Sequence, residues 1–74
     1  MYQFEFTGRA PSLAQIKAHV KKALAQGHGE IELSWGENLI ELKKNPYPYN
    51  GMGAWHGYGW IRRIGGHDLA REIK

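Results

Sequence analysis

The sequence predicts a small α+β domain in which three to four strands form one antiparallel or mixed sheet with helices packed on one face. Three observations predict this class. Apolar and polar residues alternate near the start and in the middle of the chain, apolar residues recur at helical spacing between these stretches, and a short amphipathic segment ends the chain. Because 74 residues suffice for one small core only, we expect a single domain over residues 1–74, with the order β-α-β-β-β-α.

Local signals mark the first strand and the first helix. Aromatic residues alternate with polar ones over residues 2–6, which is typical of a strand with one buried face. Ser12 and Gln15 have the spacing of a capping box, so a helix should begin there. Apolar residues then recur at steps of three and four over residues 13–24, and Gly27 provides the left-handed residue that often ends a helix.

The middle of the chain predicts a β-hairpin. Residues 30–35 and 39–43 alternate between apolar and charged or polar side chains, and Gly36 lies in the connection between them. If Ile31, Leu33, Trp35, Ile40 and Leu42 face the helix, the glutamates of this hairpin gather on the open face of the sheet. Residues 60–64 predict a further strand, and residues 67–74 predict a short terminal helix with Asp68 in its first turn and Arg71 near its end.

A long segment rich in glycine and aromatic residues, at about residues 45–59, separates the third and fourth predicted strands. Five of the nine aromatic residues lie between Tyr47 and Trp60, and loops of this length tend to be functional or disordered. Prolines stiffen its beginning and pairs of basic residues flank it. We therefore predict a binding surface made of Lys43, Lys44, Tyr47, Tyr49, Trp55, His56, Tyr58, Trp60, Arg62 and Arg63, with a secondary basic face at Lys17 and Lys21.

Two kinds of partner suit these residues. Aromatic rings stack on the bases of single-stranded nucleic acid while lysine and arginine neutralise its phosphates, so nucleic acid, single-stranded or structured, is the leading prediction. A protein target is the alternative, because tryptophan, tyrosine and arginine dominate the hot spots of protein interfaces. In that case the chain would be an inhibitor or adaptor of the phage-encoded or mobile-element-encoded type, docking on a larger nucleic-acid-handling protein through the same loop.

Other interpretations of the same residues remain open. Trp35, Tyr58 and Trp60 can equally fold back over the sheet to enlarge a thin core, whereas Tyr47, Tyr49 and Trp55 are expected to be exposed. The basic pairs can serve as the charged ends of an edge strand, and the lysines of the helix as its ordinary polar face. The glutamates of the hairpin can also imitate the phosphates of a nucleic acid.

Charge is distributed unevenly around a net value of +3. Residues 1–29 carry four basic residues against one acid, residues 30–42 carry four glutamates and no base, and residues 43–74 carry six basic residues against two acids. Basic flanks favour a polyanionic partner, although the same distribution also suits charge pairing inside a small fold.

The composition argues against several other classes of protein. Without cysteine there is neither a disulfide framework nor a thiolate metal site, and a cytoplasmic location fits best. No signal peptide and no membrane-spanning stretch is expected. No nucleophile or base motif is present, so we predict no enzyme, no cofactor and no metal, with His28, Glu30, His56 and His67 as the only alternative set of metal ligands. A free hairpin edge is compatible with a homodimer.

Overall fold

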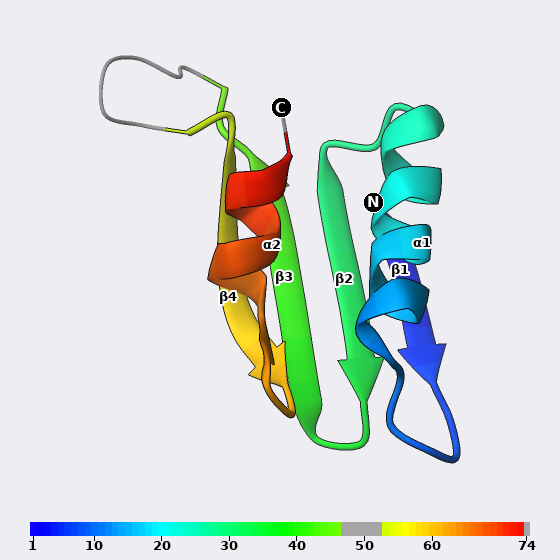
Figure 1. The fold of residues 1–74 in the computed structure, drawn as a ribbon. Coiled ribbons are helices and arrows are strands. Elements are labelled where there is room, and N and C mark those ends of the chain that lie inside the picture. The colour runs from blue at the N-terminus through cyan, green and yellow to red at the C-terminus, as the bar shows by residue number, and fades with distance from the viewer. Residues whose placement is uncertain (47–52, 74) are drawn as a thin grey trace.

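The computed structural model describes residues 1–46 and 53–73, which form the α+β architecture that the sequence predicts (Figure 1). One mixed sheet contains its strands in the order β1-β2-β3-β4-β5, with β1 parallel to β2 and the other neighbours antiparallel. Both helices lie on the same face of this sheet. Along the chain the elements are β1 (Tyr2–Phe6), α1 (Leu13–Ala25), β2 (Glu30–Trp35), β3 (Asn38–Lys44), β4 (Trp55–Ile61), β5 (Ile64–Gly65) and α2 (Gly66–Glu72).

The sheet has one strand more than expected, because the strand predicted at residues 60–64 is divided between two strands. β4 begins at Trp55 and ends at Ile61, a turn follows at Arg62 and Arg63, and β5 pairs back on β4 through two residues. Arg62 has a positive φ of 56°, a left-handed conformation that residues other than glycine rarely adopt and that does not continue an extended strand. The glycine-rich and aromatic loop predicted at 45–59 is therefore shorter, and its last five residues belong to β4.

Helix α1 begins and ends where its local signals predict. The Ser12 hydroxyl accepts a hydrogen bond from the Gln15 backbone N–H at 3.2 Å, and the Gln15 side chain accepts one from the Ser12 N–H at 2.8 Å. At the other end Gly27, with φ of 79°, donates its N–H to the Leu24 carbonyl oxygen. This helix carries the chain from β1 to β2, which run parallel and need such a crossover.

The core lies between the sheet and the two helices. The five hairpin residues that are expected to face the helix do face inward, and Ile16 and Ala23 of α1 pack against them with no exposed surface. β4 contributes Trp55 and Ile61, and α2 contributes Leu69. The hairpin residues in the core are Ile31, Leu33, Ile40 and Leu42, with Trp35 partly buried beside them.

Two glycines allow α2 to lie directly on the backbone of β4. A Cβ atom at Gly57 would come within 1.8 Å of the Gly66 carbonyl oxygen, and a Cβ at Gly66 would come within 2.3 Å of the Tyr58 carbonyl oxygen. Since no side chain fits at either position, the close contact requires glycine on both elements. The glycines at these two positions thus allow the backbone of α2 to pack directly against β4.

The start of the connection between β3 and β4 is held close to its end. Asn45 is 6% exposed, its backbone N–H donates to the Ala54 carbonyl oxygen at 2.8 Å, and its side-chain amide donates to the Gly53 carbonyl oxygen at 3.4 Å. These bonds join the two ends of the connection next to the first residues of β4.

Candidate binding surface

The uncovered face of the sheet carries the strongest candidate site, and strand alternation decides which side chains reach it. In β4, Trp55 and Gly57 are buried beneath the helices, so His56, Tyr58 and Trp60 point to the opposite side. In the neighbouring strands the inward residues are the apolar ones described above, and the outward residues are mostly charged. We call this side of the sheet the open face.

His56, Tyr58 and Trp60 form an aromatic row along β4. Tyr58 is 55% exposed and Trp60 64% exposed, which are large fractions for rings in a domain this small. The rings of His56 and Tyr58 are nearly parallel, at 18°, with their centroids 6.4 Å apart. Leu39 lies opposite Trp60 across the β3–β4 pair and is 36% exposed, so the row ends in a small apolar patch.

Four glutamates of β1, β2 and β3 lie on the open face, and we call them the acidic cluster. Glu32 of β2 and Glu41 of β3 are direct cross-strand partners, an arrangement that destabilises a sheet through like-charge repulsion. Lys43, opposite Glu30, is the one lysine or arginine that these strand pairings place among them. In the described part of the chain no ion pair involves any of the four. The cluster consists of Glu5, Glu30, Glu32 and Glu41.

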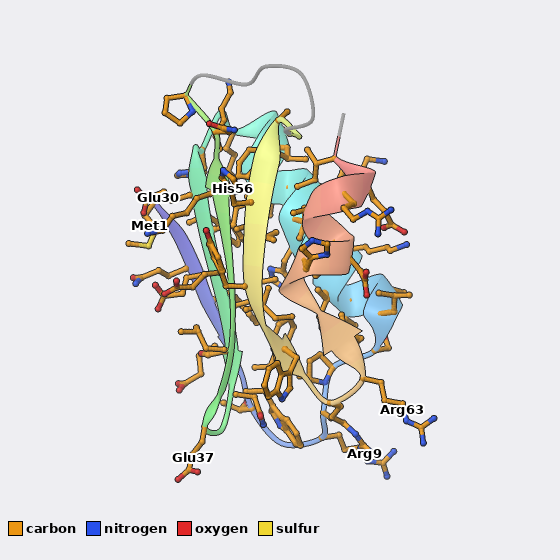
Figure 2. All side chains as sticks on the ribbon, turned by 90° about the vertical axis from the view of Figure 1, so that its left-hand side faces the viewer. Met1, Arg9, Glu30, Glu37, His56 and Arg63 are labelled. Atoms are coloured by element: carbon orange, nitrogen blue, oxygen red, sulfur yellow. The ribbon has the colours of Figure 1, made fainter. Side chains whose placement is uncertain are left out.

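The two basic pairs of the predicted surface lie at opposite ends of the sheet. Lys43 and Lys44 are exposed at the end of β3, beside the first residues of β4, whereas Arg62 and Arg63 occupy the turn after its last residue. Seven strand residues separate them by roughly 20 Å. Figure 2 shows Arg63 at the same end of the molecule as Arg9 and far from His56. The pairs therefore do not flank one continuous loop surface.

The five predicted aromatic contacts do not share one environment. Trp55 was expected to be exposed, but it is 9% exposed and belongs to the core, because it lies on the helix-covered side of β4. Tyr58 and Trp60, for which a core position was equally open, are exposed instead. Tyr47 and Tyr49 lie outside the described residues.

The secondary basic face is on the other side of the molecule. Lys17 and Lys21 belong to α1, and the Lys17 ammonium is 3.0 Å from the Glu72 carboxylate of α2. Together they border a groove of about 310 Å³ between the helices. Since the helices cover the opposite side of the sheet, these lysines cannot contact a ligand that lies flat on the open face.

A depression of about 520 Å³ lies between β4 and α2 and is lined by His56, Tyr58, His67 and Arg71 among others. It follows the part of β4 that β5 does not pair with, since β5 reaches only Trp60 and Ile61.

Within residues 1–46 and 53–73 no three histidine, aspartate or glutamate side chains gather as metal ligands. Nor does either helix, in that part of the chain, have the length and apolar character needed to cross a membrane.

Leu39 belongs to no motif, so the sequence pattern does not predict its place in the binding surface. The pattern predicts that Leu39 belongs to the hairpin but not which face of the sheet it occupies, and its pairing with Trp60 places it in the apolar patch. A signal for the aromatic row was present, however. From Trp55 onward the large residues His56, Tyr58 and Trp60 alternate with residues that the core requires to be buried or small.

The chain matches no known protein family, no curated protein and no solved structure.

Proposed function

We propose that this protein is a non-enzymatic binding module that docks on another protein through the open face of its sheet. The surface of that partner has an apolar recess surrounded by basic residues. The observation that carries the proposal is the juxtaposition of an exposed aromatic row with an acidic cluster on one uncovered face. In this arrangement Trp60 and Leu39 would enter the recess, and the glutamates would contact lysine and arginine side chains around it.

Energetics favour an external role for both features. A tryptophan that is 64% exposed contributes little to folding, whereas a tryptophan buried at an interface is often worth about 2 kcal/mol or more of binding free energy. Glu32 and Glu41 repel each other in the free protein, and a cation placed between them would remove that repulsion. Binding of a partner would thus bury the exposed ring and neutralise the repelling carboxylates.

Single-stranded nucleic acid is a second candidate, supported by the depression at the edge of β4. His56, His67 and Arg71 line it and could donate hydrogen bonds to a phosphate, while Tyr58 and Trp60 would stack on bases. The acidic cluster opposes this candidate, because four carboxylates on the same face repel a phosphate backbone. For that reason we place the protein partner first.

Charge substitutions in the acidic cluster separate the two candidates, because the expected effects have opposite signs. Peptides selected from a random library on the immobilised protein should combine lysine or arginine with one large apolar residue. Their affinity should fall at least tenfold in Glu32→Gln and in Trp60→Ala, measured by fluorescence anisotropy or calorimetry. A mixed-sequence oligonucleotide of about 15 nucleotides should bind weakly or not at all.

The nucleic-acid candidate predicts the reverse for the glutamate. Glu32→Gln would then bind the oligonucleotide more tightly, Arg71→Ala would flatten the dependence on salt, and the peptides would show no basic consensus. Lys21→Gln, on the far side of the molecule, is the control that should change neither affinity. Tighter oligonucleotide binding by Glu32→Gln would refute the protein-docking proposal.

A further inference from the structure

The outer edge of β1 is a second interaction surface. β1 is the first strand of the sheet and pairs only with β2 among the described strands, so one row of its backbone N–H and C=O groups has no strand partner. Its three central residues are exposed, and Phe4 is 40% exposed although it points to the helix-covered side. Helix α1 therefore leaves this edge accessible.

The edge lacks the features that usually prevent strands from pairing with other chains. It has no proline, no lysine and no bulge, and Glu5 is its only charged residue. Aromatic rings instead form a continuous surface on the helix side. The Phe4 ring is 4.9 Å from the Phe6 ring and 3.9 Å from the His19 imidazole, measured between centroids, and the Tyr2 hydroxyl is hydrogen-bonded to His19 at 2.7 Å.

We propose that β1 pairs antiparallel with β1 of a second copy of this chain, about a two-fold axis through Phe4, which joins the two sheets into one. The sequence of the strand is self-complementary in this register. Phe4 lies opposite Phe4 of the other copy, Tyr2 lies opposite Phe6, and Gln3 lies opposite Glu5. Aromatic residues thus meet aromatic residues on the helix side, and on the open face an amide meets a carboxylate that it can hydrogen-bond.

Other registers are less favourable. A shift by one residue would put aromatic and polar residues on the same face of the joined sheet. A shift by two residues in one direction places Glu5 opposite Glu5 of the other copy, so that two carboxylates repel each other. A shift by two residues in the other direction places Glu5 opposite Met1, and Gln3 opposite Gln3 of the other copy. Only the register centred on Phe4 pairs all five residues of β1 with suitable partners.

Paired substitutions at Gln3 test this register, because the side chain is exposed and its replacement leaves the core intact. Sedimentation equilibrium should show a species of twice the 8.4 kDa mass of one chain at high concentration. Gln3→Lys should lower the dimer dissociation constant and Gln3→Glu should raise it, each by roughly twofold to thirtyfold, because two such pairs occur per dimer. Glu41→Lys, two strands away, is the matched control and should leave the constant unchanged.

Several results would overturn the proposal. One is a wild-type protein that stays monomeric up to about 1 mM. Another is a change in the same direction for both Gln3 variants, which is expected if Gln3 faces Gln3. Dissociation of the dimer by Trp60→Ser would show that the copies associate through the open face instead. Since the aromatic row is on β4, this inference does not depend on the proposed function.

Discussion

Replacing Trp55 by alanine should destabilise the fold severely, whereas replacing Trp60 should not. Trp55 is 9% exposed and packs in the core, where removal of such a ring typically costs about 3–5 kcal/mol. A chain of this length has a total stability of roughly 4–11 kcal/mol, so the Trp55→Ala variant would lose a large part of it. Trp60 is 64% exposed, and its replacement should change the free energy of unfolding by no more than about 0.5 kcal/mol.

Urea denaturation followed by far-ultraviolet circular dichroism measures both effects without relying on tryptophan fluorescence. The midpoint of Trp55→Ala should shift far below that of the wild type, and its thermal midpoint should fall by more than about 10 °C. Trp60→Ala should superimpose on the wild type and lose affinity for the selected peptides. Equal stability losses in the two variants would refute the assignment of faces in β4, and with it the aromatic row.

Three further predictions concern stability. Gly57→Ala should lower the free energy of unfolding, measured by urea denaturation, by about 1–3 kcal/mol or more, because its Cβ would collide with the backbone of Gly66. Gly53→Ala should lower it far less, because the atom nearest to its Cβ would be 3.6 Å away. Equal losses in the two variants would contradict the close contact of α2 with β4. Glu41→Lys should stabilise the free protein by roughly 0.2–1 kcal/mol, because it replaces a repulsive cross-strand partner of Glu32 by an attractive one. A lower thermal midpoint in this variant would contradict the pairing of residues 32 and 41. Burial, and then the nearby Lys22 charge, lower the pKa of His19 below its ordinary 6.5, so the unfolded chain takes up this proton first. The contribution of His19 to stability should therefore be constant above about pH 7 and decrease as the pH falls through 6.5 towards the lower pKa of the folded state. The His19→Gln variant should lose less stability than the wild type between about pH 7.5 and 5.5, and an equal loss in both proteins would exclude His19 as its source.

The first half of the fold could be predicted because its signals are local. The capping box at Ser12 and the alternation in the hairpin each depend on neighbours within a few residues, and both occur as predicted. The gathering of the glutamates on the open face follows from the same alternation. No tertiary information was needed for these elements.

The second half depends on tertiary contacts that the sequence does not display. The buried positions of β4 include Gly57, which carries no side chain to mark a hydrophobic pattern, and its place is explained only by the approach of α2. Without a hydrophobic pattern to mark this part of the strand, the sequence predicts a loop position for Trp55. Trp55 and Trp60 are five residues apart, so in one regular strand they must lie on opposite faces, and the exposed one is Trp60.

The separation of charge between the two sides of the sheet gives the molecule an electric dipole moment. On the helix-covered side the lysines of α1 and Arg71 outnumber Asp68 and Glu72, and on the open face the glutamates of β1, β2 and β3 outnumber Lys43. Despite its net charge of +3, the protein should therefore be retained by both cation-exchange and anion-exchange resins at low ionic strength. Near any charged macromolecule it would rotate before contact, so that the side of opposite sign arrives first.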